Sequence, residues 1–113
     1  MILNRICLAG NMTKPIEVKS SSGGKVYGVF DLAVSERVSK DKEETLFIRV
    51  TCFGKTAEYL GENTYKGSNV YVEGRLQRSE YESNGEKKYA FAVVANSVQV
   101  IPRAEKKSKD DEW

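Results

Sequence analysis

The chain has 113 residues, a net charge of +2 and 30% charged residues, which describe one globular domain that is only mildly basic. The absence of histidine excludes Ser-His and Cys-His nucleophile pairs and histidine metal ligands, and two cysteines are too few for a cysteine-built metal centre. We therefore expect neither an enzyme nor a metal or other cofactor. No apolar run could span a bilayer and no signal peptide is recognisable, so the expected location is cytoplasmic.

The first third of the chain alternates as strands do. Residues 2–10 predict the first strand, and residues 16–19 return to extended structure after a break at Pro15. Residues 26–35 predict the second long strand, with Phe30 on its core face. The highly charged residues 36–44 are interpreted as a mobile hairpin loop.

The third predicted strand, TLFIRVTCF at residues 45–53, has two unlike faces. One face takes the apolar side chains Leu46, Ile48, Val50 and Cys52. The other takes Phe47, Arg49, Thr51 and Phe53. A second core is the alternative for this face, but an unpaired arginine between two rings would be costly to bury. We therefore predict that it is exposed and binds a ligand.

The remaining chain predicts one helix and two further strands. Residues 55–63 predict the helix and residues 69–76 the fourth strand. Residues 77–88 contain Asn84-Gly85, a strong signal for a tight turn in a projecting hairpin, and residues 89–101 predict the fifth strand. Five strands with one short helix between the third and fourth predict an all-β OB-fold, a Greek-key barrel, although a generic small β-barrel fits nearly as well.

Short motifs follow one another along the predicted domain. They are N-x-I-x-L-x-G at 4–10, F-x-L-A-V at 30–34, F-G-K-x-A-E at 53–58, K-G-S-x-V-x-V-E-G-R-L at 66–76 and Y-E at 81–82. In this order they resemble the bacterial-type single-stranded-DNA-binding proteins, an OB-fold family. The resemblance implies a DNA-binding domain at residues 1–102. It also implies sequence-independent binding and protection of single-stranded DNA at the nucleoid during replication, recombination and repair.

The resemblance also implies roles for individual residues. Phe47, Phe53 and Tyr81 match positions that stack on bases, and Arg49 and Lys55 match cationic contacts to the phosphate backbone. Stacking is largely indifferent to base identity, since every base has a π-face, and cations follow the phosphates. Further expected contacts are Arg37, Lys40, Lys14 and Lys87, and also Tyr71, for which a structural role is an equal alternative.

Three departures from the family pattern indicate a divergent member, such as one from a phage or mobile element. Val38 stands where relatives often have tryptophan, and Arg78 is shifted by one position, which turns it to the opposite strand face. The chain ends in Trp113 rather than in a proline-phenylalanine pair. Two other classes stay open: a replication-restart module that mainly contacts proteins, and a nuclease built from acids such as Asp31 and Glu73.

The resemblance implies assembly and protein partners as well. We expect a homotetramer, with a dimer as the second possibility, built on the first strand around Arg5 and Cys7. Residues 103–113 are almost wholly charged and are predicted to be disordered. Their tip is implied to dock replication and repair proteins through Asp110, Asp111, Glu112 and Trp113.

Overall fold

The computed structural model describes residues 1–102, so the predictions made for residues 103–113 lie outside the described part of the chain. The strands are β1 (Ile6–Met12), β2 (Glu17–Ser20), β3 (Val26–Ser39), β4 (Lys42–Phe53), β5 (Asn69–Ser83) and β6 (Glu86–Ile101). Helix α1 (Gly54–Asn63) lies between β4 and β5, where a single short helix was predicted. Within residues 1–102 no helix has the length and apolar character needed to cross a membrane.

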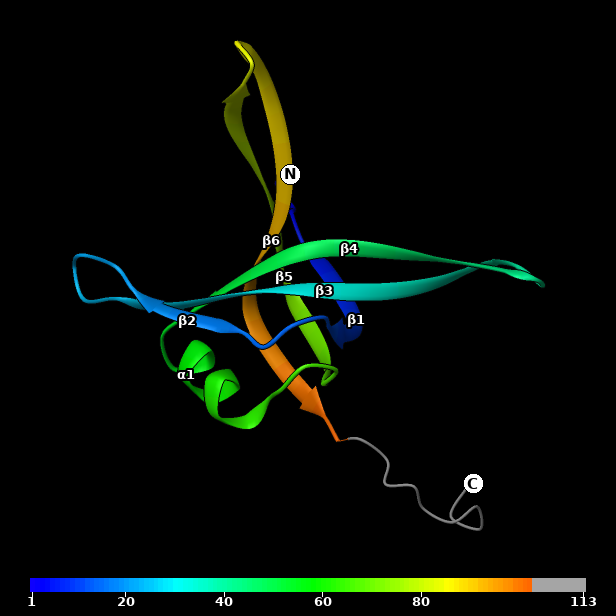
Figure 1. Ribbon diagram of the computed structural model, residues 1–113, viewed down its shortest axis with the longest axis horizontal. Coiled ribbons are helices and arrows are strands. Elements are labelled where there is room, and N and C mark those ends of the chain that lie inside the picture. Colours follow the sequence, from blue (N-terminus) through cyan, green and yellow to red (C-terminus); the bar gives the residue numbers. More distant parts are fainter. Residues whose placement is uncertain (103–113) are drawn as a thin grey trace.

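Five of the strands close into a barrel in the order β1-β5-β6-β4-β3, and a second pairing between β1 and β3 completes the circle (Figure 1). β2 is a short additional strand on the free edge of β3. All pairings are antiparallel except that of β4 with β6. The predicted OB-fold Greek-key barrel is therefore confirmed.

The inward-facing side chains form the core as the alternation predicted. Phe30 is only 3% exposed, and Val50 and Cys52 on β4 are fully buried. α1 covers one end of the barrel with Ala57 and Leu60, both fully buried. Burial disfavours the thiolate and raises the pKa of Cys52 to about 11, so this side chain is an apolar filler of the core.

The prediction of a loop at residues 36–44 is wrong. β3 continues to Ser39 and β4 begins at Lys42, so the two strands form a long hairpin with a short turn between them. This hairpin leaves the barrel, as Figure 1 shows at the right. Both of its faces meet solvent there, so its sequence lacks the apolar alternation of a half-buried strand. For the same reason Leu46, which was expected in the core, is 49% exposed.

A second hairpin, formed by β5 and β6, projects from the barrel in another direction (Figure 1). Its two-residue turn is the predicted Asn84-Gly85, and both residues have the positive φ angles of a tight hairpin turn. At the base of this hairpin the register shifts between Glu73 and Gly74. A Cβ on Gly74 would overlap the carbonyl group of Val94, so only glycine allows β5 and β6 to approach so closely at this bend.

The first strand begins later than predicted, at Ile6 instead of residue 2. The side chain of Asn4 takes over the pairing with β5: its amide group donates to the Leu76 carbonyl at 2.9 Å and its Oδ1 accepts from the Leu76 N–H at 3.0 Å. Ile2 and Leu3 therefore extend from the barrel with their side chains exposed.

Candidate nucleic-acid interface

The outer face of β4 has the composition that the alternation predicted. Phe47 is 66% exposed and Phe53 is 53% exposed, while Val50 and Cys52 on the opposite face are fully buried. Arg49 lies between the two rings on the same side, and its side chain is 63% exposed. Two rings and one guanidinium are thus presented to solvent along a single strand.

The neighbouring strand adds a residue that the sequence reasoning did not connect to this face. Cross-strand pairing places Asp31 of β3 directly opposite Arg49, and Nε of Arg49 donates to Oδ1 of Asp31 at 3.4 Å. Tyr27 is paired with Phe53, and Ala33 is paired with Phe47. Counting outward from the Ser39–Lys42 pair at the turn would place Asp31 opposite Val50, because the register shifts by one residue between Arg37 and Ser39.

On the other side of β4, the face continues across β6 and β5. Arg49 is paired with Ala92 of β6, and Ala92 is paired with Gln77 of β5. The small side chain of Ala92 therefore lies between Arg49 of β4 and Gln77 of β5. Tyr81, four residues beyond Gln77, points to the same side of β5 and is 49% exposed. This surface is hereafter called the aromatic face: the outer side of β3, β4, β6 and β5 bearing Phe47, Arg49, Phe53 and Tyr81.

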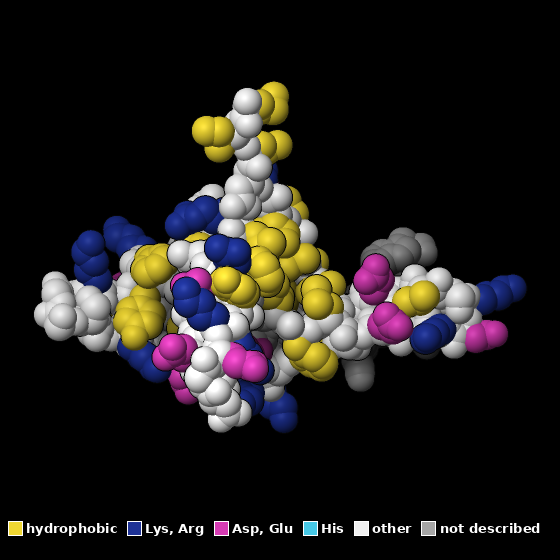
Figure 2. All heavy atoms as spheres, turned by 90° about the horizontal axis from the view of Figure 1, so that it is seen from above, with side chains coloured by type: hydrophobic (Ala, Val, Ile, Leu, Met, Phe, Trp, Pro, Cys, Tyr) yellow, Lys and Arg dark blue, Asp and Glu magenta, His cyan; other side chains and the backbone are white. Residues whose placement is uncertain are grey.

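The predicted basic contacts are dispersed around the aromatic face. Lys55 lies in the first turn of α1, two residues after Phe53, and Lys14 is exposed after β1. Arg37 and Lys40 are near the tip of the β3–β4 hairpin, where Arg37 is paired with Glu43. Figure 2 shows Lys and Arg side chains mixed with acidic ones along that hairpin. The hairpin tip is therefore not a uniformly basic surface.

The β5–β6 hairpin separates residues that are adjacent in sequence. Tyr81 is paired with Lys88, whereas Lys87 is paired with Glu82 and points to the other side. Lys88 is thus the lysine beside Tyr81, a neighbour that counting from the Asn84-Gly85 turn would have found. Arg78 also lies on the side away from Tyr81, as its shifted position predicted, and its guanidinium covers the ring of Tyr89 at 4.5 Å.

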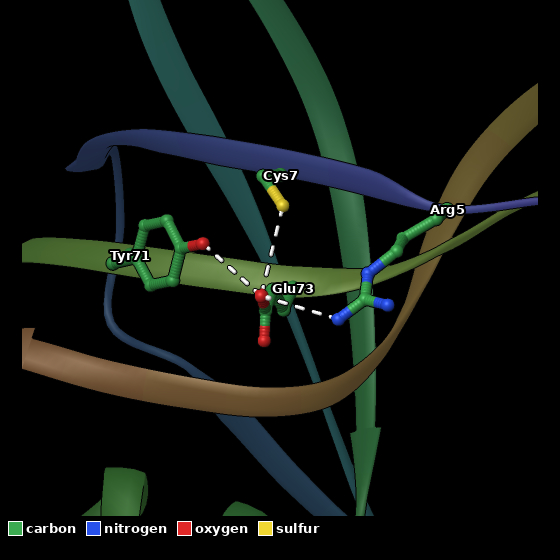
Figure 3. A network of polar contacts seen from close by, with 4 residues as sticks. All are labelled: Arg5, Cys7, Tyr71 and Glu73. Atoms are coloured by element: carbon green, nitrogen blue, oxygen red, sulfur yellow. Dashed lines mark hydrogen bonds and ion pairs between the residues drawn. The ribbon is translucent and has the colours of Figure 1, made fainter.

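Tyr71 is not brought together with the other aromatic residues of the predicted site. It lies at the opposite end of β5, where its hydroxyl donates to Glu73 Oε2 at 3.2 Å. The same oxygen accepts from the Cys7 thiol at 3.8 Å and lies 3.6 Å from Nη2 of Arg5 (Figure 3). The pKa of Tyr71 is raised to about 12. The largest cause is the side-chain hydrogen bond with Cys7, and burial and the negative charge of Glu73 add to it.

These four side chains form one polar network between β1 and β5, which we call the Arg5 network: Arg5, Cys7, Tyr71 and Glu73. The acids Asp31 and Glu73, considered above for nuclease chemistry, each pair with an arginine. Within residues 1–102 no group of three or more His, Cys, Asp and Glu side chains is placed to hold a metal ion.

Comparison with known proteins agrees with the fold. The model of the single-strand binding protein family matches residues 3–101. The chain is 41% identical over 101 residues to a single-stranded DNA-binding protein of Fusobacterium nucleatum, covering 86% of this chain and 66% of that protein. It is 38% identical to one from Clostridium tetani, covering 94% and 75% respectively.

One solved structure has the same architecture. It is described as a Plasmodium falciparum SSB complex with ssDNA, and it matches 90% of this chain and 97% of its own chain with a TM-score of 0.82 at 23% identity. The chain spans about two thirds of the length of the Fusobacterium relative. From the family match over residues 3–101 and these identities, the chain belongs to the single-strand binding protein family.

Proposed function

We propose that this chain binds single-stranded DNA without regard to sequence and protects it during replication, recombination and repair. The observation that carries the proposal is the aromatic face, where Phe47 and Phe53 flank Arg49 on β4 and Tyr81 stands on the adjoining β5–β6 ribbon. An exposed ring stacks on an unpaired base with about 1–3 kcal/mol, whichever base it is. A duplex keeps its bases stacked inside and offers no such surface.

Charge supplies the second part of the binding energy. Arg49 and Lys55 lie next to the rings, where they can follow the phosphates between stacked bases. Lys88 is paired with Tyr81 and Arg37 lies toward the tip of the β3–β4 hairpin, and we include Lys40 and Lys14 as further contacts, while Lys87 and Tyr71 lie on other surfaces of the protein. We include no catalytic step in this function and place the protein with the DNA in the cytoplasm.

The test is a titration of labelled oligo-dT followed by fluorescence anisotropy. We expect single strands to bind far more tightly than a duplex of equal length, with similar affinities for oligo-dT and mixed sequences. The affinity should fall steeply with salt as condensed counterions are released. Equal affinity for duplex and single strand would exclude this function. Incubation of the protein and oligonucleotide with magnesium, followed by a gel, tests the nuclease alternative in the same sample.

We further propose that the protein assembles as a homotetramer, or failing that as a dimer. Two features of the described residues support assembly. β1 pairs with β3 only through Asn11 and Met12, and the β3 backbone also lies close to Gly10, so one backbone edge of the strand is open along Ile6–Ala9 for pairing with another strand. The second feature is the Arg5 network, which joins Arg5 and Cys7, before and on β1, to Tyr71 and Glu73 on β5.

An apolar surface continues the core out of the barrel. Leu46, Leu76 and Phe91 share the core-facing side of their strands but lie where the hairpins leave the barrel, and all three are exposed. Figure 2 shows apolar side chains gathered beside the root of the β3–β4 hairpin. Surfaces of this kind are typical of subunit contacts.

Light scattering at micromolar protein concentration tests the assembly. We expect the mass of four chains, and a smaller mass for a variant carrying both Leu46→Ser and Phe91→Ser. A monomeric mass for the unmodified protein would contradict the proposal. A protein-docking role for the acidic tip at residues 110–113 completes the proposed function, and its test is given in the Discussion.

A further inference from the structure

An acidic side chain in the middle of a surface proposed to bind a polyanion needs an explanation. Asp31 lies on the aromatic face, opposite Arg49 and one strand away from Phe47 and Phe53. Its neighbours along β3 on this face are Val29 and Ala33, so no second carboxylate on this strand shares its surroundings. The residue is not needed to neutralise a buried charge, because the Arg49 side chain is 63% exposed and that of Asp31 is 35% exposed. An ion pair with this exposure contributes little to folding stability.

The geometry of the pair separates two parts of the guanidinium. Asp31 accepts from Nε of Arg49 at 3.4 Å, and this is the hydrogen bond that the arginine side chain makes among the described residues. The two terminal Nη groups, which form the forked edge that matches a phosphate, make none there. A bond to Nε orients the guanidinium toward Asp31 while leaving its fork available.

The same carboxylate has an electrostatic cost. It places one negative charge within a few ångströms of the only arginine between the two rings of β4, and therefore beside the path of the phosphates. When Arg49 contacts a phosphate, Asp31 repels that phosphate and retains part of the local cation atmosphere. The net number of ions released on binding is then smaller than the number of phosphate contacts.

Resting on the function proposed above, we propose that Asp31 is a positioning residue for Arg49. It holds the guanidinium with its fork toward the DNA, and its charge lowers both the affinity for single strands and the steepness of the salt dependence. The aromatic face therefore binds with a larger share of stacking and a smaller share of charge than its basic residues alone would give.

Two substitutions separate the two effects. Asp31→Asn keeps an oxygen that can accept from Nε but removes the charge, and Asp31→Ala removes both. Asp31→Glu restores the charge and serves as the conservative variant. Glu62→Gln, which removes one exposed carboxylate from α1 and not from the aromatic face, is the control for the change in net charge.

The experiment measures the dissociation constant of oligo-dT for each variant at several salt concentrations between 50 and 200 mM. For Asp31→Asn we expect tighter binding than for the unmodified protein, and a slope of log K against log salt that is steeper by about 0.7, the value of one phosphate contact on a single strand. Its affinity advantage over the unmodified protein should then shrink by about 2.6-fold over this range. Asp31→Ala should show the steeper slope but bind more weakly than Asp31→Asn, whereas Asp31→Glu and Glu62→Gln should keep the original slope.

Equal slopes for the unmodified protein and Asp31→Asn would overturn the electrostatic part of the proposal. Equal affinities for Asp31→Asn and Asp31→Ala would overturn the positioning part. A thermal melt of each variant shows whether the fold is kept, and a role in folding alone would change the melting temperature without changing the slope. If the unmodified protein itself fails to bind oligo-dT, the proposed function fails, which is a different outcome from unchanged slopes.

Discussion

Replacing Phe47 by alanine should remove binding energy without unfolding the protein, because the ring is 66% exposed. Burial of a whole phenylalanine side chain stabilises a fold by up to about 3 kcal/mol, so the buried third of Phe47 contributes about 0.5–1 kcal/mol. Loss of one stacked base costs about 1–3 kcal/mol of binding free energy, which raises the dissociation constant about 5- to 140-fold. Phe53→Ala and Tyr81→Ala should behave in the same way.

Phe30→Ala is the opposite case, since this ring is 3% exposed at the centre of the core. Its removal leaves a cavity and should cost about 3–5 kcal/mol of the free energy of unfolding. Tyr59→Ala is the matched control for an exposed ring outside the aromatic face, because Tyr59 lies on α1 and is exposed. Tyr59→Ala should leave the oligo-dT affinity unchanged and cost only a small amount of stability, comparable to that lost in Phe47→Ala.

Two measurements on the same preparations distinguish these outcomes. Urea unfolding gives the stability of each variant, and anisotropy titration with oligo-dT gives its affinity. Phe47→Ala should bind oligo-dT more weakly at a nearly unchanged free energy of unfolding. Phe30→Ala should show a large decrease in the free energy of unfolding. A loss of stability in Phe47→Ala as large as that in Phe30→Ala would refute the assignment of the two strand faces.

Three further predictions concern other parts of the chain. Gly74→Ala should destabilise the fold by about 1–3 kcal/mol in urea unfolding, because the new Cβ meets the Val94 carbonyl group at the bend of β5, whereas Gly23→Ala, in open space, should not. Folding raises the pKa of Cys52 from 9.0 to about 11, so the folded state holds this proton longer and stability should fall as the pH rises from 9 through 11. Cys52→Ala should flatten that decline, and an unchanged pH profile would contradict the assignment. Deletion of residues 110–113 should abolish capture of replication proteins from a lysate while leaving oligo-dT affinity unchanged or slightly raised; loss of DNA binding would instead assign the tip to the DNA site.

Much of this protein can be predicted from local sequence patterns. The two faces of β4 follow from alternation alone, since neighbouring side chains on a strand point to opposite sides whatever the rest of the chain does. The turn at Asn84-Gly85 is equally local, because it depends on two residues that accept positive φ angles. Phe30 in the core and Phe47 and Phe53 at the surface were therefore predicted correctly.

Other features depend on which strands meet. Residues 36–44 lack an apolar face, so their sequence does not indicate strands. Only the pairing of β3 with β4 along their length shows that they continue the hairpin. Leu46 has the alternation of a core residue and is nevertheless exposed, because the barrel ends before the strand does. The position of Tyr71 in the Arg5 network depends on β1 lying beside β5, more than sixty residues away in sequence.

The Asp31–Arg49 pair shows the difference most clearly. The sequence determined that each side chain points outward from its own strand. Only the tertiary structure decided that the two lie opposite one another, with Ala92 and Gln77 completing the row across β6 and β5. The reason is physical: the direction of a side chain is set by the backbone of its own strand, whereas its neighbours are set by hydrogen bonds between strands whose register forms only when the whole barrel closes.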